Sequence, residues 1–178
     1  SVLPAALALL ALIVTGPSFA AAAEPELPGY VKTHLSFLDE SFRILDMTAG
    51  KIWPGWKNYN DFPFMFTYTN GLNVLIGHPN PPAEFHKLAG LSVAGKDVYA
   101  DFSKISDIPQ EEPLFAGGGP NFFGTNKAGE PVQTIFMNYF SARKGMKGGQ
   151  GAVPGPYTVE SQIMCFIHEL FHCFQMSG

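Results

Sequence analysis

One stretch near the start of the chain repeats apolar residues every three or four positions. It runs from Val31 to Met47, and its apolar members are Val31, Leu35, Leu38, Phe42 and Leu45. This spacing places them on one face of a helix. Pro28 and Gly29 precede the stretch and Gly50 follows it, as is typical of helix ends. The pattern predicts a packing helix over about 31–47.

The pattern changes to a β-rich one between about Trp53 and Phe140. In "FPFMFTYTNGLNVLIGHP" aromatic and β-branched residues flank Asn70-Gly71, which predicts a hairpin with a type I′ turn. "LSVAGKDVYADF" predicts a second hairpin that turns at Gly95-Lys96, and "PVQTIFMNYF" predicts a further strand. The Gly- and Pro-rich stretches "GHPNPPAEFH" and "FAGGGPNFFGTNKAGEP" between them predict loops.

The last periodic segment predicts a helix from about Thr158 to the chain end. Thr158 suits the N-cap, and Glu160 suits the positive end of the helix dipole. Apolar residues cover most sides of this helix: Ile163, Phe166, Ile167, Leu170, Phe171 and Phe174. We therefore expect it to be buried.

Composition restricts the class of protein. The chain has 178 residues, of which 46% are hydrophobic and 15% are charged, enough for one folded domain. The net charge of -4 gives no basic surface for nucleic acid. Trp53 and Trp56 are expected to fix a turn and a corner of the core, with a binding cleft as the alternative.

Residues 1–23 have the layout of a secretory signal peptide. An apolar run from Val2 to Val14 is broken at Gly16-Pro17, and small residues follow with cleavage sites after Ala20 or Ala23. The run is shorter than the roughly 20 residues that span a bilayer, which disfavours a membrane anchor. The charged start of a signal is missing, so we expect the natural sequence to begin earlier. The signal predicts a secreted or periplasmic protein.

The predicted terminal helix carries His168-Glu169-Leu170-Phe171-His172, an HExxH sequence. Residues four apart lie one turn apart on nearly the same side of a helix, so His168 and His172 can bind one Zn²⁺ ion. Glu169 lies about 100° further round and can act as a general base towards water. Buried ionisable groups are normally paired or bound to metal, which also favours a metal site. The alternative is a pair of hydrogen-bonded core histidines.

The segment "HELFH" resembles the zincin metallopeptidases. The resemblance implies that His168 and His172 are zinc ligands and that Glu169 is the catalytic general base. It also implies an α+β, zincin-like fold in which a helix and a β-rich hairpin region precede a buried active-site helix. Residues 24–178 would then be the N-terminal part of a metallohydrolase domain.

The resemblance fits the gluzincin branch better than the metzincin branch. Metzincins need Gly and His where this chain has Gln175 and Gly178. Gluzincins take a third ligand from a following helix, so we expect that ligand beyond Gly178 and little activity from residues 1–178 alone. The other histidines, His34, His78 and His86, are expected at the surface, with a loop-borne third ligand as the alternative.

These observations predict an exported zinc metallopeptidase that cuts peptide or protein substrates. "QTIFMNYF" is the candidate edge strand for aligning a peptide, with an interior strand as the alternative. The rival functions are a non-catalytic exported binding module and a zinc hydrolase of non-peptide substrates. Cys165 and Cys173 are about 12 Å apart along one helix, too far for a mutual disulfide, so each is free or pairs with a cysteine outside this chain.

Overall fold

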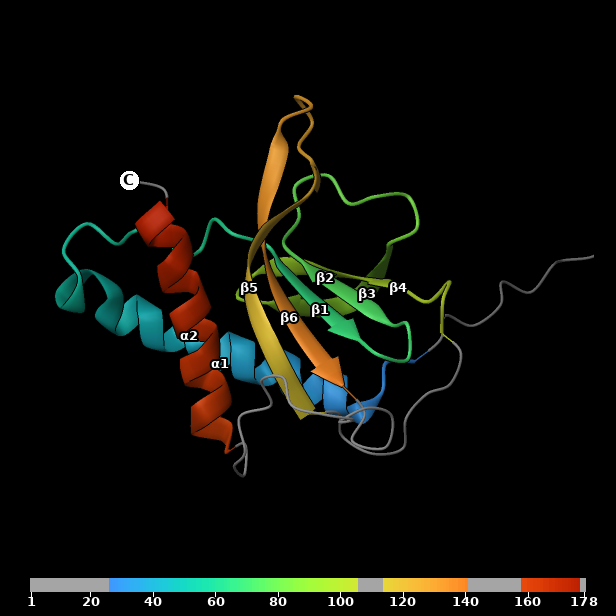
Figure 1. Cartoon of the computed structure of the whole chain (residues 1–178), viewed down its shortest axis with the longest axis horizontal. Helices are drawn as coiled ribbons and strands as arrows, with labels where there is room; N and C mark the ends of the chain where they lie inside the picture. The colour runs from blue at the N-terminus through green and yellow to red at the C-terminus, as the bar shows by residue number, and fades with distance from the viewer. Residues whose placement is uncertain (1–25, 106–113, 141–157, 177–178) are drawn as a thin grey trace, which may run out of the picture.

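The computed structural model describes residues 26–105, 114–140 and 158–176. They form an α+β fold with two helices and six strands (Figure 1). The elements are α1 (Gly29–Ile52), β1 (Phe64–Tyr68), β2 (Asn73–Ile76), β3 (His86–Val93), β4 (Lys96–Asp101), β5 (Leu114–Thr125), β6 (Pro131–Phe140) and α2 (Val159–Met176). The predicted order of helix, β-rich region and terminal helix is confirmed, and α1 extends beyond the predicted range at both ends.

The six strands form one mixed sheet in the order β3-β4-β2-β1-β6-β5. β1 and β6 are parallel, and every other neighbouring pair is antiparallel. The strand predicted from "PVQTIFMNYF" is β6, and it lies inside the sheet between β1 and β5. The edge-strand interpretation of this segment is therefore wrong, and its interior alternative is confirmed.

The main core lies between one face of the sheet and both helices. Alternate β1 residues point to this face, where Phe64 packs against Phe42 of α1 at 6.0 Å and against Phe166 of α2 at 6.2 Å between ring centroids. Phe66 stacks on Phe166 at 5.7 Å. Both helices thus cover the same face of the sheet, and Figure 1 shows α2 crossing α1 beside β5.

The first hairpin forms where it was predicted, but its turn is of another type. Gly71 N–H donates to Tyr68 O at 2.9 Å, and Tyr68 N–H donates to Leu72 O at 3.0 Å, which closes a three-residue loop. Gly71 has φ of 92° whereas Asn70 does not have a positive φ, so the type I′ expectation is wrong. The side-chain Oδ1 of Asn70 instead accepts the Leu72 N–H at 3.2 Å.

The second hairpin turns one residue earlier than predicted. Val93 pairs with Lys96, so Ala94 and Gly95 form the turn, with φ of 48° and 74°. Two positive φ values are the requirement of a type I′ turn. The Ala94 N–H donates to Oδ1 of Asp39 on α1 at 2.7 Å, and this contact supports alanine in a conformation that it rarely adopts.

Replacing Ala94 by glycine should therefore stabilise the protein by about 0.5 kcal/mol, because glycine adopts positive φ without the steric cost. Urea unfolding monitored by circular dichroism measures the change. The matched control is Ala89→Gly in β3, an exposed alanine, which should lose about 0.5–1 kcal/mol of stability. Equal losses for both variants would contradict the role assigned to the Ala94 turn.

The glycine-rich stretch predicted as a loop forms β5, the edge strand beside α2. Gly117 and Gly119 have φ of 154° and 155°, and both pair with β6. Pro120 is accommodated because a strand at a sheet edge needs hydrogen bonds on one side only. Glycine and proline have low β propensity, so the sequence of this stretch does not predict a strand. It forms a strand because it pairs with β6.

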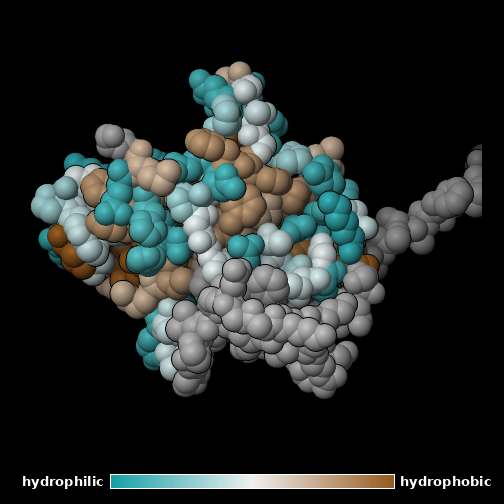
Figure 2. All heavy atoms as spheres, in the orientation of Figure 1, coloured by the Kyte–Doolittle hydropathy of each residue, from teal (hydrophilic) through white to brown (hydrophobic). Residues whose placement is uncertain are grey.

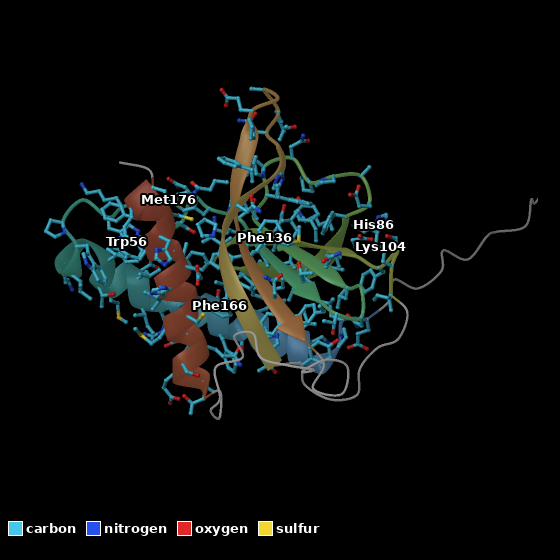
Figure 3. The ribbon with its side chains drawn as sticks, in the orientation of Figure 1. Trp56, His86, Lys104, Phe136, Phe166 and Met176 are labelled. Atoms are coloured by element: carbon cyan, nitrogen blue, oxygen red, sulfur yellow. The ribbon has the colours of Figure 1, made fainter. Side chains whose placement is uncertain are left out.

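A second, smaller apolar cluster lies on the sheet face opposite the helices. It contains buried Met65, Leu75 and Phe85, with half-buried Tyr99, Phe123 and Phe136 packed around them. Figure 2 shows it as an apolar area near the centre of the visible face, where Figure 3 labels Phe136. The sheet is therefore apolar on both faces, and the two helices of the described residues cover only one of them.

The predicted signal peptide, residues 1–23, lies outside the described residues. Within the described ranges, neither helix is long and apolar enough to cross a membrane.

Candidate metal centre

The candidate site is built on α2, which begins as predicted. The Thr158 hydroxyl caps the helix by accepting the Ser161 N–H at 3.2 Å. The apolar side of α2 packs into the core through Ile163, Phe166, Ile167, Leu170 and Cys173. Phe166, labelled in Figure 3, lies between α2 and the sheet.

Aromatic packing fixes the C-terminal half of α2. Phe171 lies 5.3 Å from Trp56 and 4.5 Å from Trp53 between ring centroids, and Phe174 lies 5.9 Å from Trp56. Trp56 is fully buried, which agrees with the predicted corner of the core, whereas Trp53 is 37% exposed. These contacts hold the helical turns that carry the histidines.

His168 and His172 point their Nε2 atoms at each other from consecutive turns. The two Nε2 atoms are 2.9 Å apart, and the rings are nearly perpendicular with centroids 4.4 Å apart. His168 is exposed and His172 is half-buried, so the expectation that the helix buries both rings is wrong. The histidines lie on the solvent side of α2 because its apolar residues occupy the other sides.

Gln175 orients the second histidine. Its Oε1 lies 3.2 Å from Nδ1 of His172. When the ring proton is on Nδ1, Nδ1–H donates to Gln175 Oε1 and Nε2 accepts a hydrogen bond from Nε2–H of His168. Zinc-binding histidines usually donate their other N–H in this way. The HExxH motif does not include this role of Gln175, although its position three residues after His172 on a helix was a usable signal.

The histidine pair fits a zinc ion with a small adjustment. Two nitrogens that are each about 2.05 Å from a tetrahedral zinc ion lie about 3.3 Å apart. The observed separation of 2.9 Å would have to widen by about 0.4 Å, which small torsional changes of the exposed His168 side chain can supply. Imidazole nitrogens are among the ligands that zinc binds, and one helix presents two of them here.

Glu169 lies between the solvent side of α2 and strand β5. It is 8% exposed, and its Oε2 lies 4.0 Å from where a Cβ on Gly119 would be. Burial raises the pKa of Cys165 to about 11 and that of Cys173 to about 12, and the nearby Glu169 carboxylate contributes to both shifts. Both thiols are therefore protonated at neutral pH, and they are not bonded to each other, as the helix geometry predicted.

The other histidines are held elsewhere in the fold. His34 is fully buried in α1, with Nδ1 2.9 Å from the Tyr68 hydroxyl. His78 is 4% exposed, and its Nε2 lies 2.9 Å from Phe123 O. Surface positions were thus predicted wrongly for these two and correctly for His86, which is exposed on β3.

A third ligand does not join the pair in the described ranges. Among residues 26–105, 114–140 and 158–176, no three His, Cys, Asp or Glu side chains lie close enough to hold one ion. The expected position of the third ligand, beyond Gly178, lies outside the described residues. The described site thus consists of two nitrogen donors and an adjacent carboxylate.

Comparisons with protein-family models, with curated proteins and with solved structures found no match to this chain.

Proposed function

We propose that the protein is an exported zinc-dependent metallopeptidase of zincin-like fold, with His168 and His172 as zinc ligands and Glu169 as general base. The observation that carries the proposal is that the Nε2 atoms of His168 and His172 lie 2.9 Å apart. Glu169, which follows His168 on the same helix, is a nearly buried carboxylate. The apolar run from Val2 to Val14 supports export. The proposal requires a third ligand from outside the described ranges.

The position of Glu169 directly after His168 on α2 supports its proposed role as general base. When bound, Zn²⁺ would supply a Lewis acid that makes a water acidic near neutral pH. Glu169 accepts a proton from the attacking water on a carboxylate oxygen and passes it to the leaving nitrogen. The low exposure of Glu169 keeps bulk water away from this proton.

Strand β5 offers a place for the substrate backbone. It pairs with β6 on one side, and no strand of the described residues pairs with it on the other side. An extended peptide can add to such an edge through main-chain hydrogen bonds. Gly117, Gly118 and Gly119 carry no side chains, which allows a close approach opposite Glu169. This favours a peptide over a compact non-peptide substrate.

Zinc content tests the metal site. The full-length wild-type protein should contain about one zinc ion per chain, and His168→Ala should lose most of it because one imidazole and the third ligand together hold zinc poorly. Plasma emission spectrometry of dialysed protein measures this. His86→Ala, which removes an exposed histidine on β3 far from α2 in Figure 3, is the matched control and should keep its zinc.

Two outcomes would count against the proposal. A wild-type protein without zinc would favour the non-catalytic binding module. Zinc in the wild type combined with no chelator-sensitive peptide cleavage would favour a zinc hydrolase of another substrate class.

A further inference from the structure

The solvent side of α2 carries a row of residues at four-residue spacing: Met164, His168, His172 and Met176. Residues four apart stand one turn apart on nearly the same side of a helix. Met164 is 61% exposed and Met176 is 64% exposed, while His168 is exposed and His172 is half-buried. Figure 1 shows α2 in front of α1, with its outer side uncovered by the described elements, and Figure 3 labels Met176 near the end of the helix. The row is therefore an apolar surface with the histidine pair at its centre.

The order of residue types in the row, Met-His-His-Met, is the same in either direction. Two copies of α2 can therefore meet antiparallel about a two-fold axis through the middle of the row, which is the isologous contact of a symmetric dimer. In this arrangement Met164 of each copy lies beside Met176 of the other, and the two histidine pairs face each other. Glu160, one turn before Met164, would lie beyond the end of the other helix.

Charge and ligand number both favour this contact. Two copies of one face carry the same charges, so a charged face repels itself, whereas this row contains no Lys, Arg, Asp or Glu. Structural zinc ions are almost always bound by four protein ligands. The histidine pair supplies two of them, and no further His, Cys, Asp or Glu joins the pair in the described ranges. A second copy of the chain supplies the two nitrogens that complete a tetrahedral site.

We propose that one Zn²⁺ ion can join two copies of the chain, bound by Nε2 of His168 and His172 from each copy. The inference rests on the proposed function, since it takes these histidines to be the zinc ligands. Four nitrogens leave no position for water on the ion, so the zinc-linked dimer is inactive in hydrolysis. The dimer holds half as much zinc per chain as the proposed active form. By mass action it is therefore favoured when zinc is scarce, and excess zinc separates it into chains that each hold one ion.

A zinc titration of the metal-free full-length protein, followed by sedimentation velocity, tests the proposal. The protein should be monomeric with chelator and should reach its largest dimer fraction near about half a zinc ion per chain. It should return to monomer as the ratio passes about one ion per chain. His172→Ala should remain monomeric at every ratio, because each copy then offers only one nitrogen of the pair.

Methionine substitutions test the row on either side of the histidines. Met164→Ala combined with Met176→Ala should raise the dissociation constant of the dimer at least about 10-fold, because the apolar contact between the copies is lost. Zinc uptake to about one ion per chain should not change, since both histidines remain. Val159→Ala, which shortens an exposed apolar residue of α2 outside the row, is the matched control and should dimerise like the wild type.

The inference would be overturned by the absence of a dimer at every zinc ratio, or by a dimer that persists with chelator, with excess zinc or in His172→Ala. An unchanged dissociation constant in the double methionine variant would also overturn it. Zinc binding and peptide cleavage without any dimer would leave the proposed function standing. A dimer at about half an ion per chain, with no peptide cleavage at any ratio, would mean that the proposed function fails while this inference stands.

Discussion

Replacing Glu169 by glutamine should lower kcat for a peptide substrate about 10²- to 10⁴-fold, the range typical of a lost general base. Glutamine has nearly the same shape but cannot accept the proton of the attacking water. The histidines are unchanged, so zinc should stay bound. Single-site peptide cleavage and zinc content, measured on the same full-length protein, test both parts of the expectation.

Glu160→Gln is the matched control for this substitution. It removes a carboxylate from the same helix, but Glu160 is exposed in the first turn and lies away from the histidines. Its activity should match the wild type. Full activity of Glu169→Gln would exclude the general-base role. Loss of both zinc and activity would mean that Glu169 is needed for zinc binding.

Acid should destabilise the protein through His34, by about 3 kcal/mol between pH 6.5 and pH 4. Burial lowers the pKa of His34 from 6.5 to about 4 in the folded protein. Its ring stacks on Tyr139 with centroids 4.1 Å apart, and Nδ1 lies 2.9 Å from the Tyr68 hydroxyl.

The direction follows from which state binds the proton. Above pH 6.5 His34 is neutral in both the folded and the unfolded protein, so its contribution to stability does not change with pH. Between pH 6.5 and 4 the unfolded chain takes up a proton that the folded protein does not, so the free energy of unfolding falls as pH falls. Below pH 4 both states are protonated and the loss is complete.

Urea unfolding at a series of pH values, with chelator present to remove any effect of metal, measures this loss. His34→Phe keeps an aromatic ring beside Tyr139 but does not titrate, so the decrease below pH 6.5 should shrink by about 3 kcal/mol. His86→Gln, which removes an exposed histidine, should retain the decrease. Equal slopes in wild type and His34→Phe would show that His34 is not the group responsible.

Local sequence patterns predicted those parts of the fold that depend on residues near one another. The three- and four-residue spacing in α1, the Asn70-Gly71 hairpin and the "PVQTIFMNYF" strand all form. The spacing of His168 and His172 was enough to predict that their rings meet, because a helix alone sets that geometry. The two turns differ only slightly from their predictions. The second hairpin turns one residue earlier than predicted, and Asn70 lacks the positive φ that a type I′ turn needs.

Contacts between distant segments decided what these patterns could not. "FAGGGPNFFGT" becomes the edge strand because β6 pairs with it, and no property of the stretch itself predicts that partner. His34 is buried because α1 packs against Tyr68 and Tyr139, and the placement of Gly119 beside Glu169 joins segments about fifty residues apart. The sequence by itself determined the helix and the meeting of its two histidine rings. Only the tertiary structure decided which strand lies beside the Glu169 carboxylate and which polar groups are removed from water, because strand pairing and burial depend on residues that are distant in the sequence.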